Sequence, residues 1–166
     1  METPWKALLW SQFGAAIDML ENALVACPEE VWSDRSRQPE YWYIVFHTLF
    51  WLDLYLTESP EGFAPPHPYG LEELDPAGII PERVYTKAEL LSYLEHGRNK
   101  LRSILSTMTE ESFRAPRTFH SVQGTLAEVL IYNLRHVQHH AAQLNLILRQ
   151  RIDSAPTWVS KTKKPL

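Results

Sequence analysis

The sequence predicts an all-α protein, in which four helices of a single domain, residues 1–166, form a bundle. Two observations lead to this prediction: four segments carry helix start and stop signals, and a long proline-rich stretch separates the second from the third. Hydrophobic residues make up 45% of the chain and charged residues 22%, a composition typical of folded globular proteins. A chain of 166 residues is long enough to bury a substantial core.

Prolines bound the first two predicted helices. Pro4, preceded by Thr3, suits the first position of a helix because its missing N–H would have no partner there, and this helix is expected to run to about Ala26. The second helix is expected over residues 39–57. Its aromatic and β-branched stretch, residues 41–46, also has strand propensity, but a length of about 19 residues favours a buried helix.

Capping boxes mark the start of the third and fourth predicted helices. Thr86 and Glu89 can satisfy each other's orphan backbone donors, and Thr125 with Glu128 repeats the pattern. The two helices are expected to continue to about residues 108 and 151. No segment of the chain predicts a strand.

Residues 58–85 form a separate compositional zone that holds six of the twelve prolines. A structureless segment this long is unusual inside a compact domain. It is explained if the second and third helices run parallel, because the chain must then return along the whole bundle, about 30 Å. The alternative is a linker between two small domains, neither of which would bury enough surface alone.

The charge of the chain does not favour a nucleic-acid partner. The formal net charge is −4 and the pI is about 6.0. Basic residues gather only near the end of the chain, at Lys161, Lys163 and Lys164, whereas nucleic-acid binding needs a basic patch.

Cysteine content and hydropathy predict a cytoplasmic protein that does not cross a membrane. Cys27 is the only cysteine, which excludes an internal disulfide and favours a reducing compartment. The first residues lack the basic and apolar regions of a secretory signal. The most apolar run, Tyr41–Leu56, contains His47 and Asp53 and is shorter than the roughly 20 residues of a membrane-spanning helix.

His136 and His140 are four residues apart on the fourth predicted helix, so their imidazoles lie side by side. Two nitrogens at about 2.0–2.1 Å from one ion fit this separation. The pair alone is a weak signal, because such histidines are more often ordinary surface residues. Val137 follows His136, so the glutamate of the H-E-x-x-H protease motif is absent and that class of metalloprotease is excluded.

His47 lies on an apolar face of the second predicted helix, where an unpaired polar group would cost about 1–3 kcal/mol. A core histidine bonded to a backbone carbonyl or a tyrosine hydroxyl is one interpretation. If the second and fourth helices are neighbours, a third metal ligand beside the pair explains it better.

The segment Phe46–Trp51, together with His136, His140 and the following Gln143-Leu144, resembles the DinB/YfiT-like family over essentially the whole chain. This resemblance implies a four-helix bundle of up-down-down-up topology with a long crossover between helices 2 and 3. It also implies that His47, His136 and His140 bind a divalent metal ion. Family members commonly have Arg-Gly where this chain has Ala141-Ala142, so a substrate contact through that arginine does not transfer.

Two functions follow as hypotheses. The first is a metal-dependent enzyme, either a hydrolase or, as in some relatives that it resembles, a thiol-dependent transferase or isomerase with a small-molecule substrate. The ion can be zinc, nickel or iron, since imidazole suits all three. Asn133 and Gln143 are candidates to orient His ligands or substrate, or else exposed polar residues, and no catalytic residue is identified.

The second hypothesis is a non-enzymatic, metal-stabilised bundle that acts in dimerisation or partner binding. The second predicted helix is apolar almost all round, which suggests a further partner surface, most simply a homodimer. In a monomer the segment 58–85 would have to cover that helix instead.

Overall fold

The computed structural model describes residues 4–166, so the expected helix start at Thr3 lies outside the described part. Four long helices account for most of this part, with two short helices, one 3-10 turn and a small sheet between them. In chain order the elements are α1 (Pro4–Ala26), α2 (Glu29–Trp32), α3 (Tyr41–Tyr55), η1 (Glu72–Leu74), α4 (Lys87–Thr107), α5 (Glu110–Arg114), β1 (Pro116–Phe119), β2 (Val122–Thr125) and α6 (Leu126–Ile152).

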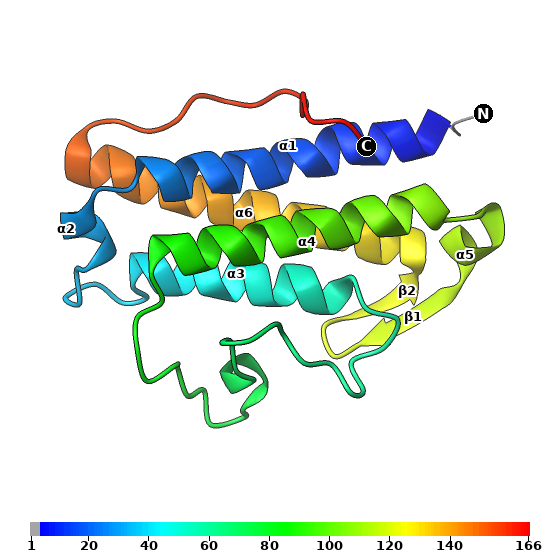
Figure 1. Cartoon of the computed structure of the whole chain (residues 1–166), viewed down its shortest axis with the longest axis horizontal. Coiled ribbons are helices and arrows are strands. Elements are labelled where there is room, and N and C mark those ends of the chain that lie inside the picture. Colours follow the sequence, from blue (N-terminus) through cyan, green and yellow to red (C-terminus); the bar gives the residue numbers. More distant parts are fainter. Residues whose placement is uncertain (1–3) are drawn as a thin grey trace.

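The four long helices lie side by side, with α3 and α4 running in one direction and α1 and α6 in the other (Figure 1). Helix α1 packs against α4 and α6, and α3 packs against the same two helices. Residues 56–86 return along the outside of α3 and α4, as expected from the proline-rich composition of this segment. This arrangement makes α3 and α6 neighbours.

The predicted helix starts of α4 and α6 are present. The Thr86 side chain accepts a hydrogen bond from the Glu89 backbone N–H, and Thr125 accepts one from Glu128. In return, each glutamate side chain accepts a hydrogen bond from the backbone N–H of its threonine. These boxes define where the chain leaves the crossover and the small sheet.

Helix α3 is buried on almost every side within the chain itself. Tyr43, His47 and Trp51, one turn apart, are its partly exposed residues. The crossover covers another side of α3, where Tyr69 and Tyr85 pack on Phe46. Helix α3 therefore does not need a second copy to bury its apolar surface, and the homodimer stays a prediction.

The expectation that the chain has no strands is wrong. Strands β1 and β2 form an antiparallel hairpin in which Pro116 pairs with Thr125 and Phe119 with Val122. Four residues are too few for an alternating pattern to stand out in a sequence. Burial of Phe119, which packs edge-on against Tyr55, attaches the hairpin to the end of α3.

The residues after α6 follow α1 in extended form (Figure 1). The Thr162 N–H donates to the Ser11 carbonyl, and the Trp10 indole N–H donates to the Lys164 carbonyl. In residues 4–166 no helix has the length and apolar character required to cross a membrane.

Candidate metal centre

Three histidines from two helices converge on one point. His47 comes from the middle of α3, and His136 and His140 come from adjacent turns of α6. The His47 and His136 Nε2 atoms are 3.4 Å apart, and one nitrogen from each of the three rings lies within 4.8 Å of the others. Helices α3 and α6 pack against each other, and this contact brings all three predicted ligand residues together.

The packing of α6 against α3 positions the histidines. Asn133, one turn before His136, is fully buried, and its amide donates to the Leu52 carbonyl over 3.0 Å. Val137 and Ala141, which each directly follow one of the two histidines, are also fully buried, so His136 and His140 lie at the edge of the core beside α3.

A carboxylate that the sequence did not single out completes the surroundings of His47. Glu73, in η1 of the crossover, accepts a hydrogen bond from His47 Nδ1 over 2.7 Å and one from Trp51 Nε1 over 2.8 Å. The acidic pair Glu72-Glu73 in a proline-rich segment was the only available signal. Helical periodicity does not extend into an irregular segment, so it cannot show which residue meets α3.

Glu73 is held as a carboxylate despite its burial. Burial alone would raise its pKa, but hydrogen bonds from His47, Tyr43 and Trp51 outweigh that effect and lower the pKa below its ordinary value. An ionised Glu73 can only accept hydrogen bonds, so Nδ1 of His47 carries a proton, and in the neutral form of the ring the lone pair is on Nε2.

A hydrogen bond from the solvent side, made by Gln143, orients His140. Its exposed side-chain carbonyl accepts a hydrogen bond from His140 Nδ1 over 2.7 Å, which leaves a lone pair on His140 Nε2. Asn133, the other predicted orienting residue, is bonded to α3 instead and belongs to the core.

The imidazoles of His136 and His140 are neutral in the fold. Burial, together with the neighbouring His140 and His47, lowers the pKa of His136 to about 3. Burial likewise lowers the pKa of His140 to about 4, although the bond to Gln143 acts in the opposite sense. Neutral imidazole is the form that binds metal ions, because the ligand nitrogen must be free of its proton.

The donor set fits a divalent ion. Two nitrogens bound to one ion at about 2.0–2.1 Å with tetrahedral angles are about 3.4 Å apart, which matches the His47–His136 separation. The widest nitrogen pair would have to approach by about 1.4 Å, from 4.8 to 3.4 Å, within reach of a side-chain rotation. Without an ion, a proton on His136 Nε2 lets this atom donate to the lone pair of His47 Nε2, and a metal ion would take the place of that proton.

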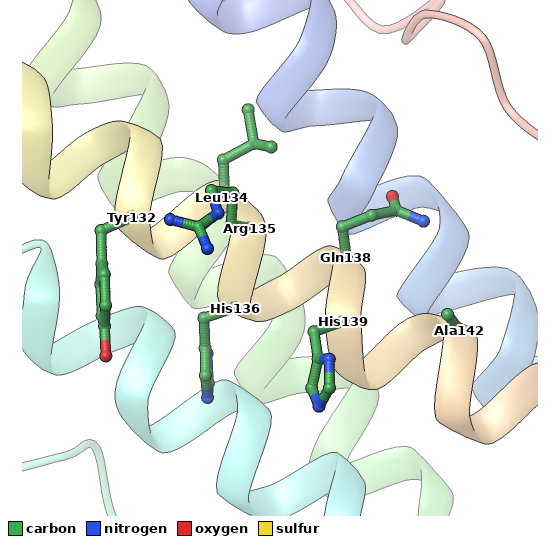
Figure 2. Close-up of a pocket in the computed structure, with 7 residues that line it drawn as sticks. All are labelled: Tyr132, Leu134, Arg135, His136, Gln138, His139 and Ala142. Carbon is green, nitrogen blue, oxygen red and sulfur yellow. The ribbon is translucent and has the colours of Figure 1, made fainter.

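A surface hollow of about 560 Å³ lies beside His136 (Figure 2). Tyr132, His136 and His139 project to one side of α6, and Leu134 and Gln138 project to the other. Ala142 also lines this hollow, whereas Ala141 is buried in the core. An arginine at position 141 would have to bury its guanidinium, so Ala141 serves packing here.

Two other histidines and the cysteine do not belong to this cluster of three histidines. His120 is exposed at the turn of the hairpin, and His96 approaches the buried Asp53 on the α4 side of α3. Burial raises the pKa of the Cys27 thiol to about 12, so it is a packing residue rather than a nucleophile.

Comparison with known proteins identifies a family. The family model described as DinB superfamily matches residues 12–144, which includes all three histidines. No curated protein matches the chain.

Proposed function

The chain belongs to the DinB superfamily, and on that premise we propose that it binds one divalent metal ion through His47, His136 and His140 and acts as a metal-dependent enzyme. The observation that carries this proposal is the convergence of three imidazoles from α3 and α6, with the His47 and His136 Nε2 atoms at metal-ligand spacing. We further assign the four long helices to an up-down-down-up bundle, supported by their packing and directions (Figure 1).

Three protein ligands leave coordination positions for water or substrate. A divalent ion so held polarises an oxygen or lowers the pKa of a bound water or thiol. We therefore propose either a hydrolase or a thiol-dependent transferase or isomerase that acts on a small molecule. The hollow beside His136 supports this proposal, because it leaves room for a substrate next to a ligand.

Among residues 4–166, no side chain stands out as a general base. Glu73 is the nearest carboxylate, but it lies behind His47, on the nitrogen opposite the one that faces His136. Hydrogen bonds from His47 and Trp51 hold Glu73 there. The chemistry is then expected to depend on the ion and on orientation of the substrate.

Metal analysis of the purified protein tests the ligand set. We expect about one divalent ion per chain, as zinc, nickel or iron, by plasma mass spectrometry, and loss of that ion in His47→Ala and His140→Ala. His139→Ala is the matched control, since His139 is an exposed neighbour on α6 outside the triad, and it should retain the ion. Wild-type protein that stays metal-free after incubation with all three metals would refute the proposal.

A second candidate is a metal-stabilised protein that acts in homodimerisation or partner binding. Ile131 and Leu146 are large apolar side chains that stay exposed on α6, and a partner that docks along this helix would bury them. Access to the ion discriminates the two functions. Azide should change the visible spectrum of the cobalt-substituted protein if a position is open for substrate, and leave it unchanged if the site is closed and structural.

A further inference from the structure

Given the proposed metal binding, on which this inference rests, we propose that Glu73 is a positioning residue that orients His47 for the ion. Glu73 is 26 residues from His47 and belongs to the crossover rather than to either ligand-bearing helix. Its hydrogen bond thereby makes the crossover part of the metal centre.

The contacts of Glu73 are those of a buried, oriented acceptor. Its side chain is 5% exposed, and Oε2 lies 2.7 Å from His47 Nδ1. The Trp51 indole, which can only donate, lies 2.8 Å from the same oxygen. Two donors one turn apart on α3 therefore hold Oε2 in one position.

The hydrogen bond and the ligand position use opposite nitrogens of the ring. With the proton on Nδ1, the lone pair of His47 is on Nε2, and this is the atom 3.4 Å from His136 Nε2. A carboxylate behind a ligand histidine fixes both its tautomer and its rotation, and it strengthens the imidazole as a donor.

The other two histidines lack such a partner. His140 Nδ1 bonds to the exposed amide of Gln143. His136 Nδ1 is buried and has no hydrogen-bond partner among the described residues, 4–166. Within the part of the chain that the structure describes, Glu73 is thus the one carboxylate bonded to a ring of the triad. Removal of the Glu73 carboxylate should therefore weaken metal binding more than removal of the Gln143 contact.

The tautomer of His47 provides a test that needs no metal. In metal-free protein at about pH 8, nitrogen NMR should show the neutral form of His47 with its proton on Nδ1. Glu73→Ala should allow the Nε2–H form to appear, and Glu73→Gln should keep the Nδ1–H form, because the amide carbonyl still accepts. An unchanged tautomer in Glu73→Ala would overturn the proposal, whatever the protein does with metal.

Metal affinity provides the second readout, by competition with a chromophoric chelator. Glu73→Ala should weaken binding about 10–100-fold, the usual cost of losing such a partner, and Glu73→Gln should weaken it about 2–10-fold. The matched control is Glu72→Gln, the neighbouring carboxylate of η1, which should bind as tightly as the wild type.

The outcomes separate the two proposals. If wild-type protein binds metal and both Glu73 variants bind it within about twofold of wild type, the role of Glu73 is refuted and metal binding stands. If Glu73→Ala does not fold, Glu73→Gln decides: weakened binding with the Nδ1–H tautomer retained supports the role, and unchanged binding refutes it. If wild-type protein binds no metal, the metal proposal fails and the tautomer result still tests the Glu73–His47 contact.

Discussion

The individual residues of the metal centre combine burial with neutrality. His136 and His140 stand at the edge of the core, where desolvation and the neighbouring imidazoles disfavour a positive charge. An imidazole that stays neutral to low pH keeps its lone pair for a metal. Because it takes up a proton more readily in the unfolded state, acid then favours unfolding.

The folded-state pKa values therefore predict acid-sensitive stability in the metal-free protein. The pKa of His136 is about 3 and that of His140 about 4, both below the ordinary value of about 6.5. Between about pH 6.5 and 4 the unfolded state thus binds more protons than the folded state. As the pH is lowered through this range, the free energy of unfolding decreases by up to about 1.4 kcal/mol per pH unit for each histidine. Above about pH 6.5 this contribution does not change.

Urea unfolding of chelator-treated protein across this range measures the slope. His136→Gln should make the pH dependence shallower than in the wild type, because one unfolded-state proton is lost. His120→Gln, at an exposed turn, should leave it unchanged. Equal slopes in all three proteins would contradict the assignment.

Among the elements, the crossover between α3 and α4 has two roles. It covers α3 with Tyr69 and Tyr85, and it delivers Glu73 to His47. Few of its backbone groups are hydrogen-bonded; in η1, the Leu74 and Asp75 N–H groups donate to the Leu71 and Glu72 carbonyls. Such a segment opens locally more easily than the long helices.

Metal binding is expected to stabilise η1 through Glu73. Addition of one equivalent of zinc should slow amide hydrogen exchange at Leu74 and Asp75 about fivefold or more, the lower end of typical coupling between sites. Amides paired within the β1–β2 hairpin, to which neither Glu73 nor a residue of the triad belongs, should change less and serve as the internal control. Equal slowing in both segments would indicate global stabilisation and contradict a specific link.

For the whole molecule, a buried arginine joins helices that are far apart in the sequence. The Arg98 side chain on α4 is 0% exposed and pairs with Asp18 and Glu21 of α1 at 2.6 and 2.5 Å. Lys164, near the end of the chain, binds Glu21 at 2.7 Å, so the same carboxylates hold the final segment against α1.

Arg98→Met should lower the free energy of unfolding by about 3 kcal/mol, because it removes the buried cation that pairs with two partly buried carboxylates and leaves them the weaker contact with the partly exposed Lys164. For a chain of this size the midpoint of thermal unfolding should fall by about 6–12 °C. Arg102→Met, one turn later and partly exposed, is the control and should change stability by less than about 1 kcal/mol. A smaller effect of Arg98→Met than of Arg102→Met would contradict the role of this network.

The sequence by itself determined the helical character, the starts of α4 and α6, the long return between α3 and α4, and the three candidate ligands. These features are local or periodic: a capping box spans four residues, and His136 and His140 are one turn apart whatever α6 packs against. Only the tertiary structure decided that Asn133 is a core residue, that Gln143 reaches His140, and that residues 116–125 form a hairpin. It alone also brought Glu73 to His47, because the path of an irregular segment depends on what it packs against rather than on any period in its own residues.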